Sequence, residues 1–137
     1  MKWDDSFALG IEAIDNQHRR IFEHMLALEN AVSKRDPWHI LHFFLAQLTD
    51  YVRFHLEVED ALLEIIGFPD RDEHAASHDR LRKQLTSLED QLKAKPTGES
   101  LVSFFEEWFV RHVQNGDRGY AAYIRETMPR LLPGQAG

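Results

Sequence analysis

Cysteine is absent from this chain of 137 residues. Its absence excludes disulfides, thiolate metal ligands and thiol redox chemistry, and with them iron–sulfur clusters and blue-copper sites. Any metal in this protein must therefore be held by nitrogen and oxygen atoms.

Long apolar runs and an excess of positive charge are also missing. No segment approaches the roughly 18 consecutive apolar residues of a membrane-spanning helix, and 23 acidic against 16 basic residues give a formal net charge of −7. This balance disfavours nucleic acid and membrane as partners. The densest basic cluster is Arg80, Arg82 and Lys83, which is typical of a solvated helix face. The first six residues carry acids where a secretory signal would be basic and apolar, so we expect a soluble, cytoplasmic protein.

Proline and glycine are scarce, with five and seven residues, and most of the prolines lie at three breaks, 36–37, 67–70 and 95–98. Between the breaks, apolar residues recur every three or four positions, as on one face of a helix. Four helices with short connections favour an all-α fold, an antiparallel up-down-up-down four-helix bundle. We expect one domain over residues 1–137, with an N-terminal arm at 1–13, helices at about 14–35, 38–66, 70–95 and 98–117, and a short C-terminal tail at 118–137.

Polar residues occupy several positions that this periodicity reserves for the core. A polar side chain in a core costs about 2–7 kcal/mol unless it is paired or bound to a metal. In an up-down-up-down bundle these positions fall at one end, so the side chains converge and require a common partner. The residues are His18, His55, Glu59, His74, His78, His112 and Asp117.

The spacing of these residues is typical of metal ligands. His55 and Glu59, like His74 and His78, are four residues apart, so each pair lies on one helix face. One such pair is weak evidence, but two pairs joined by further histidines and an acid are specific.

His112 and Asp117 depart from this rule because they are five residues apart. On a regular helix this spacing rotates the second side chain by roughly 140° past a full turn. We therefore predict a π-type widening or a helix end between them, with Gly116 supplying backbone freedom.

The number of candidate ligands indicates two metal ions. One zinc ion takes about four protein ligands, so seven oversupply a mononuclear centre. Two adjacent ions that share carboxylates would use all seven. Five histidines with two acids favour iron over manganese or magnesium, while copper, zinc and nickel remain open.

Over nearly its whole length the chain resembles a bacterial hemerythrin. The family pattern of seven ligands, H…HxxxE…HxxxH…HxxxxD, is present at family-like spacing. The matching stretches are Ile14–His18, His55–Asp60, Gly67–Pro69 followed by His74–His78, and Trp108–Val113 through Asp117 to Tyr120.

The resemblance implies a non-haem di-iron site that binds dioxygen reversibly, as an oxygen carrier, store or supplier, without catalytic residues. The resemblance also implies that an oxo or hydroxo ion, Glu59 and Asp117 bridge the two irons. Dioxygen would bind at the iron that has fewer histidine ligands. His74, His78 and His112 would hold one iron, and His18 and His55 the other. The candidates for an apolar wall around the site, which also read as ordinary bundle core, are Phe22, Phe54, Leu62, Phe105, Trp108, Phe109 and Val113.

Three other functions stay open. One is an oxygen or redox sensor that acts through a separate protein, and another is a di-iron enzyme that reduces peroxide or nitric oxide or oxidises ferrous iron. The third is a metal-free bundle with buried histidines.

The chain departs from the family pattern at a few positions. Leu56 and Asp60 stand where the family often has phenylalanine and glutamate. Gln114 and Asn115 make a polar segment before Asp117, and either one, facing the pocket, would hydrogen-bond bound oxygen or hasten its autoxidation.

Other polar residues have simpler interpretations. His24, His39 and His42 do not lie on the helix faces that carry the candidate ligands, and we expect them at the surface. Asp15 and Asp36 lie near helix starts, where we expect them to cap the helices.

Overall fold

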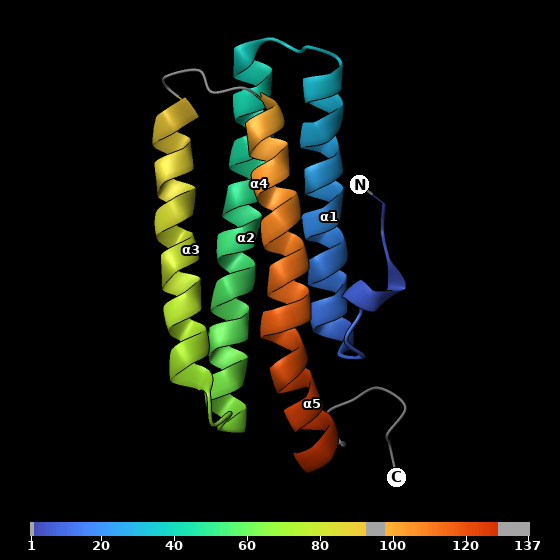
Figure 1. Ribbon diagram of the computed structural model, residues 1–137, viewed down its shortest axis with the longest axis vertical. Coiled ribbons are helices and arrows are strands. Elements are labelled where there is room, and N and C mark those ends of the chain that lie inside the picture. The colour runs from blue at the N-terminus through green and yellow to red at the C-terminus, as the bar shows by residue number, and fades with distance from the viewer. Residues whose placement is uncertain (1, 93–97, 129–137) are drawn as a thin grey trace.

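The computed structural model describes residues 2–92 and 98–128, and the proposed break at 95–98 lies mostly outside these ranges. Four long helices stand side by side as a bundle (Figure 1). They confirm the all-α four-helix architecture. The elements are η1 (Asp5–Phe7), α1 (Glu12–Ser33), α2 (Trp38–Ile66), α3 (Arg71–Leu92), α4 (Gly98–Arg111), η2 (His112–Asp117) and α5 (Arg118–Thr127).

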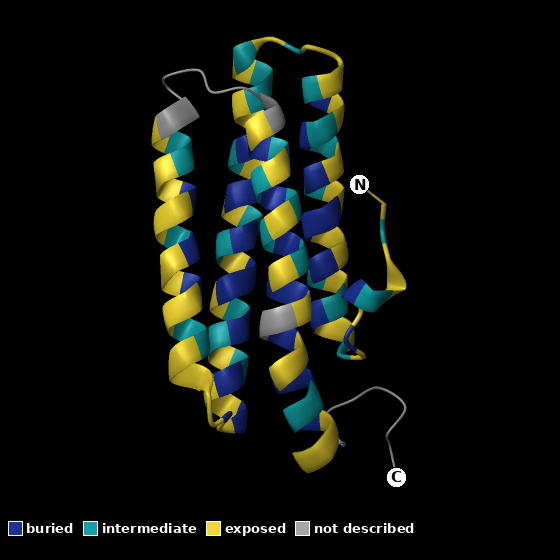
Figure 2. Ribbon diagram, viewed as in Figure 1, coloured by how far each residue is buried: buried dark blue, intermediate teal, exposed yellow. Residues whose placement is uncertain are grey.

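The bundle forms because each helix has one apolar stripe to bury. Figure 2 shows the buried residues on the inward faces of the helices, while α3 is largely exposed along its outer side. α1 packs against both α2 and α4, and α2 also packs against α3. The largest fully buried side chains include Ile21, Leu48, Leu56 and Phe105, and burial of one such side chain stabilises the fold by about 1.5–3 kcal/mol.

The helix ends follow from local sequence. α2 ends at Ile66 and is capped by Gly67, which adopts the left-handed conformation (φ 68°) that glycine accepts at no steric cost. Its N–H and that of Phe68 bond back to the last turn of α2. At the start of α1, the Asp15 carboxylate accepts hydrogen bonds from the backbone N–H groups of Leu9 and Gly10. Asp15 thus ties the preceding turn to α1 but does not cap the helix, because the N-cap position, Ile11, makes no side-chain cap hydrogen bond. Asp36 does not cap α2 either, since the N-cap of α2 is Pro37, which has no side-chain cap.

The C-terminal segment differs from the prediction of a tail from residue 118. Helix continues there as α5, through Arg118–Thr127. Tyr120, Ala121 and Ile124 are buried at three- and four-residue spacing, so the apolar stripe of α4 extends beyond the candidate ligands. Burial of this stripe keeps the segment helical. The rest of the proposed tail, residues 129–137, lies outside the described ranges.

The N-terminal arm lies against the bundle, as Figure 1 shows beside α1. Phe7 and Leu9 are buried in the core. Arg118 donates to the Ser6 carbonyl and Arg125 to the Leu9 carbonyl, at 3.1 Å each. The arm ends two residues earlier than predicted, because α1 begins at Glu12. In the described ranges, none of the helices combines the length and apolar character that crossing a membrane requires.

Candidate metal centre

All seven predicted ligands converge in the half of the bundle that holds the α2–α3 connection. His18 comes from α1, the pair His55 and Glu59 from α2, the pair His74 and His78 from α3, and His112 and Asp117 from η2. Six of them are buried and His74 is only slightly exposed. Two overlapping groups of these residues have the mutual distances of metal ligands: His18, His55, Glu59, His112 and Asp117 in the first, and Glu59, His74 and His78 in the second.

The first group is tightly packed around two carboxylate oxygens. Glu59 Oε1 lies 2.5 Å from His55 Nε2 and 2.7 Å from His112 Nε2. Asp117 Oδ2 lies 2.8 Å from His18 Nε2 and 2.9 Å from His112 Nε2. The Nε2 atoms of His55 and His112 are themselves only 3.2 Å apart. Two imidazole lone pairs at this distance repel each other, so these nitrogens require either protons or a shared cation.

The second group is more open. His74 Nε2 lies 3.7 Å from Asp117 Oδ1 and 3.9 Å from Glu59 Oε2, and His78 Nε2 lies 4.0 Å from Glu59 Oε1. These separations are too long for hydrogen bonds. They match ligands of one ion, because atoms about 2.1 Å from a metal lie about 3 Å apart at right angles and about 4 Å apart across it.

Among the described residues, four buried atoms of the candidate ligands have no hydrogen-bond partner: Glu59 Oε2, His74 Nε2, His78 Nε2 and Asp117 Oδ1. Leaving a buried polar atom unpaired costs about 1–3 kcal/mol, and more when it is charged. Four such atoms facing one another fit a metal ion as their partner. Each carboxylate also has one oxygen near His112 and the other near His74, so both carboxylates face both groups.

The π-helix η2 accounts for the five-residue spacing and confirms that prediction. A π-helix links residues five apart, so it aligns two side chains that a regular helix would separate. As a result His112 and Asp117 contact each other. Gln114 is exposed and does not face the cluster, while the side chain of Asn115 lies outside the described residues.

Outer partners hold three of the imidazoles in place. Near each Nδ1 lies an oxygen that accepts its proton: the Phe7 carbonyl at 3.2 Å for His18, Gln17 Oε1 at 2.8 Å for His55, and Asp60 Oδ1 at 2.6 Å for His78. With the proton on Nδ1, the lone pair of Nε2 points into the cluster. Sequence reasoning missed these roles.

Electrostatics in the cluster favour a charged Glu59 carboxylate. Burial alone would raise the pKa of Glu59, but the charges and hydrogen bonds of His112 and His55 lower it well below its usual range. Burial alone would lower the pKa of His112, but Asp117 and Glu59 raise it well above its usual value. Burial, with the charges of Glu59 and Asp117, raises the pKa of Tyr120, so its phenol stays neutral.

Six of the seven residues proposed for an apolar wall are buried or partly buried in the core. Phe22, Phe105, Phe109 and Val113 are buried, and two further members, Leu62 and Trp108, are partly buried against the core. The Trp108 ring stacks on His112 with centroids 5.1 Å apart.

Phe54 does not belong to this wall. Its side chain is 49% exposed. It immediately precedes His55, and one residue turns a helix by about 100°, so its side chain points away from the direction of the ligand.

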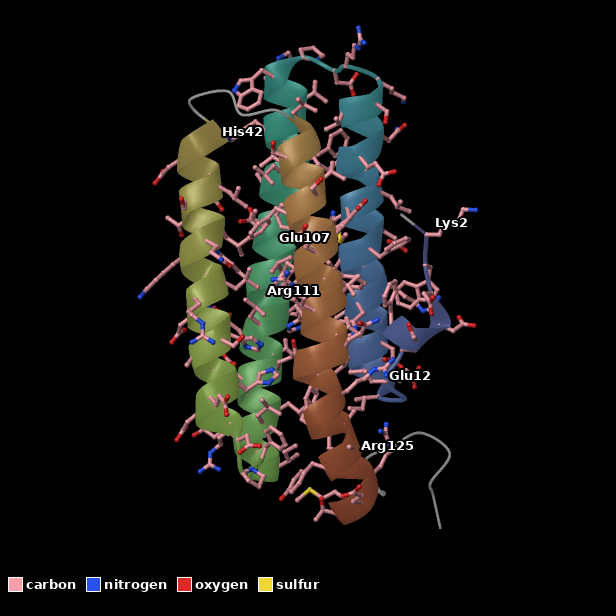
Figure 3. The ribbon with its side chains drawn as sticks, viewed as in Figure 1. Lys2, Glu12, His42, Glu107, Arg111 and Arg125 are labelled. Atoms are coloured by element: carbon pink, nitrogen blue, oxygen red, sulfur yellow. The ribbon has the colours of Figure 1, made fainter. Side chains whose placement is uncertain are left out.

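A cavity of about 590 Å³ lies between α3 and α4 and reaches the rings of His74, His78 and His112. Figure 3 shows Glu107 and Arg111 on α4, and both contribute to its lining together with Ser77. The cavity therefore borders the second group and the His112 ring.

The remaining histidines lie outside the cluster. His39 and His42 are exposed, as expected, and Figure 3 shows His42 near the opposite end of the bundle. His24 is only half-buried, with its ring beside Tyr51 at 5.5 Å between centroids.

Fold and cluster together define a class: a four-helix bundle with a buried site of histidines and carboxylates that can hold metal. The family model for the hemerythrin HHE cation binding domain matches residues 9–124. The chain belongs to the hemerythrin family.

Similar proteins support this assignment along most of their length. A bacteriohemerythrin from Pseudomonas paraeruginosa is 28% identical over 131 residues, covering 95% of this chain and 85% of the relative. One from Clostridium acetobutylicum is 30% identical over 127 residues, covering 86% and 96%. A crystal structure of wild-type hemerythrin superposes with a TM-score of 0.83 at 25% identity, covering 89% of this chain and 95% of that chain.

Proposed function

We propose that this chain binds dioxygen reversibly at a non-haem di-iron centre, as an oxygen carrier, store or supplier. The observation that carries the proposal is the set of four buried, unpartnered ligand atoms between two carboxylates that each face both groups of histidines. Iron in such a site would supply the electrons that bind oxygen. A single ion would leave part of this set without a partner.

We propose that the seven side chains together ligate two metal ions. Glu59 and Asp117 are proposed as the bridges, because each has one oxygen near His112 and the other near His74. The family pattern would group His112 with His74 and His78, whereas its Nε2 lies among the atoms of the first group. Its ring is 5.6 Å from that of His78 between centroids, so the imidazole lies at the border between both groups.

The surroundings favour binding over turnover. On the His18 side of the cluster, the buried Phe109 ring packs against the His18 ring with centroids 5.9 Å apart. Apolar packing there excludes the water and protons that would carry a reaction beyond binding. Tyr120, with a raised pKa, does not readily release a proton to the site. We therefore propose stoichiometric binding.

Anaerobic loading with ferrous iron followed by cycles of air and argon tests this function. We expect two irons per chain and a visible absorption band that appears with oxygen and disappears when oxygen is removed. The variant His78→Ala should bind less iron and lose the band. A band that never reverses, or steady consumption of oxygen or peroxide by the wild-type protein, would contradict reversible binding.

A further inference from the structure

The three histidines whose Nδ1 partners are described do not have equivalent partners. His18 and His55 donate to neutral acceptors, a backbone carbonyl and an amide oxygen. His78 faces the carboxylate of Asp60 at 2.6 Å. Among the imidazoles with a described Nδ1 partner, only His78 therefore has an anionic one.

Asp60 is itself held in place. Arg82 donates through Nη2 to Asp60 Oδ2 at 2.7 Å and through Nη1 to Asp79 Oδ1 at 2.7 Å. Arg82 was expected on a solvated face with Arg80 and Lys83, but its side chain is only 29% exposed and packs onto this pair. The result is a chain of contacts from the surface through Arg82 and Asp60 to His78.

We propose that Asp60, oriented by Arg82, is a positioning residue for the metal centre. It fixes the proton of His78 on Nδ1, turns the Nε2 lone pair toward the ion, and makes His78 a stronger donor than His18 or His55. A carboxylate does this better than an amide because its negative charge attracts the Nδ1 proton and increases the electron density of the ring. The two halves of the centre thereby become electrostatically unequal.

Geometry explains why an amide cannot replace Asp60. One carboxylate oxygen accepts from His78 and the other from Arg82, so both oxygens are used. An asparagine has only one oxygen, and its NH₂ group would face one of two donors. The exposed fraction of Asp60 is 28%, so substitution leaves no fully buried charge unpaired.

Zinc affinity, measured by competition with a chromophoric chelator, tests the inference without iron or oxygen. We expect Asp60→Asn to bind zinc about 10- to 100-fold more weakly, the range found when outer partners of metal-bound histidines are removed. Asp60→Glu should restore most of the affinity. Arg82→Gln should have a smaller effect, roughly fivefold at most, because it removes only a partly exposed ion pair. The matched control is Asp50→Asn on α2, whose carboxylate is 78% exposed.

The proton position provides a readout that a merely structural role would not change. In the zinc-loaded protein, ¹⁵N-detected NMR should show His78 protonated on Nδ1, with this proton further downfield than that of His55. In Asp60→Asn the His78 signal should move upfield while the His55 signal holds. The circular dichroism of each variant checks folding. If Asp60→Asn does not fold, the position of the His78 proton in the wild-type protein and the zinc affinity of Arg82→Gln still test the inference.

Equal zinc affinity in Asp60→Asn and Asp50→Asn, or a His78 proton on Nε2, would overturn the inference. The positioning role rests on the proposed two-metal site but is tested separately from its oxygen chemistry. If zinc affinity responds as expected while iron-loaded protein fails to bind oxygen reversibly, the positioning role stands and the proposed function fails.

Discussion

At the scale of single residues, the protein tolerates seven polar groups in its core because they face one another. The buried unpartnered atoms of Glu59, His74, His78 and Asp117 would destabilise an ordinary bundle by several kcal/mol in total. Periodicity together with bundle topology predicted these candidate ligands, since core positions can be read from a stripe of apolar residues. The outer partners Asp60 and Gln17 could not be predicted in the same way, because their positions in the sequence do not show that their side-chain oxygens accept hydrogen bonds from ring nitrogens.

Binding of metal should release a proton from His112. In the metal-free protein the pKa of His112 is well above 6.5, because Asp117 and Glu59 outweigh the effect of burial. The imidazole is therefore protonated near neutral pH and must lose that proton to bind an ion. Zinc affinity should accordingly rise with pH up to the pKa of His112, and fall as pH decreases.

Calorimetric zinc titrations at pH 7 in buffers of different ionisation enthalpy measure this proton release. At least about one proton per chain should be taken up by the buffer. A binding heat that is independent of the buffer would show that His112 is already neutral.

Glu59→Gln should remove metal binding almost completely. Its carboxylate contacts His55 and His112 and faces His74, so the change affects both groups at once. We expect zinc affinity to fall more than about 100-fold, beyond the 10- to 100-fold typical of an outer partner. Glu57→Gln, an exposed neighbour on the same helix, is the control and should bind as the wild type does. Near-wild-type affinity in Glu59→Gln would contradict its role as a shared ligand.

At the scale of elements, the segment after α4 explains both a success and a failure of prediction. The five-residue step from His112 to Asp117 predicted a π-type widening or a helix end, and the structure has the π-helix η2 there, which aligns the two side chains. The same step obscured α5, since an extra residue shifts the apolar stripe and makes Tyr120 and Ile124 look out of phase with α4. The helices with uninterrupted stripes were predicted within a few residues at the ends that the structure describes, as expected where ends fray.

Asp15 is expected to stabilise the junction between the N-terminal arm and α1. Its two carboxylate oxygens accept from the N–H groups of Leu9 and Gly10, and Leu9 is buried beside them. Asp15→Ala should lower the free energy of unfolding by about 1–2 kcal/mol, the net worth of one or two lost hydrogen bonds. Urea unfolding of the metal-free protein measures the change, with exposed Glu12→Ala as control. Equal stability of the two variants would argue against a stabilising role for these two hydrogen bonds.

At the scale of the whole molecule, metal should act as part of the fold, because all four long helices or their extensions contribute ligands. An ion that binds only the folded state stabilises it by about 2.7 kcal/mol when present at 100 times its Kd. Removing zinc with a chelator should therefore lower the Tm by roughly 10 °C for a chain of this size. An unchanged Tm, measured by circular dichroism, would indicate a bundle that does not depend on metal.

The most direct measurement is X-ray diffraction from crystals of the iron-loaded protein at wavelengths on both sides of the iron absorption edge. The account predicts two neighbouring anomalous peaks among the seven side chains, with Glu59 and Asp117 each contacting both and Asp60 still bonded to His78 Nδ1. A single peak, or two peaks that share neither carboxylate, would contradict it.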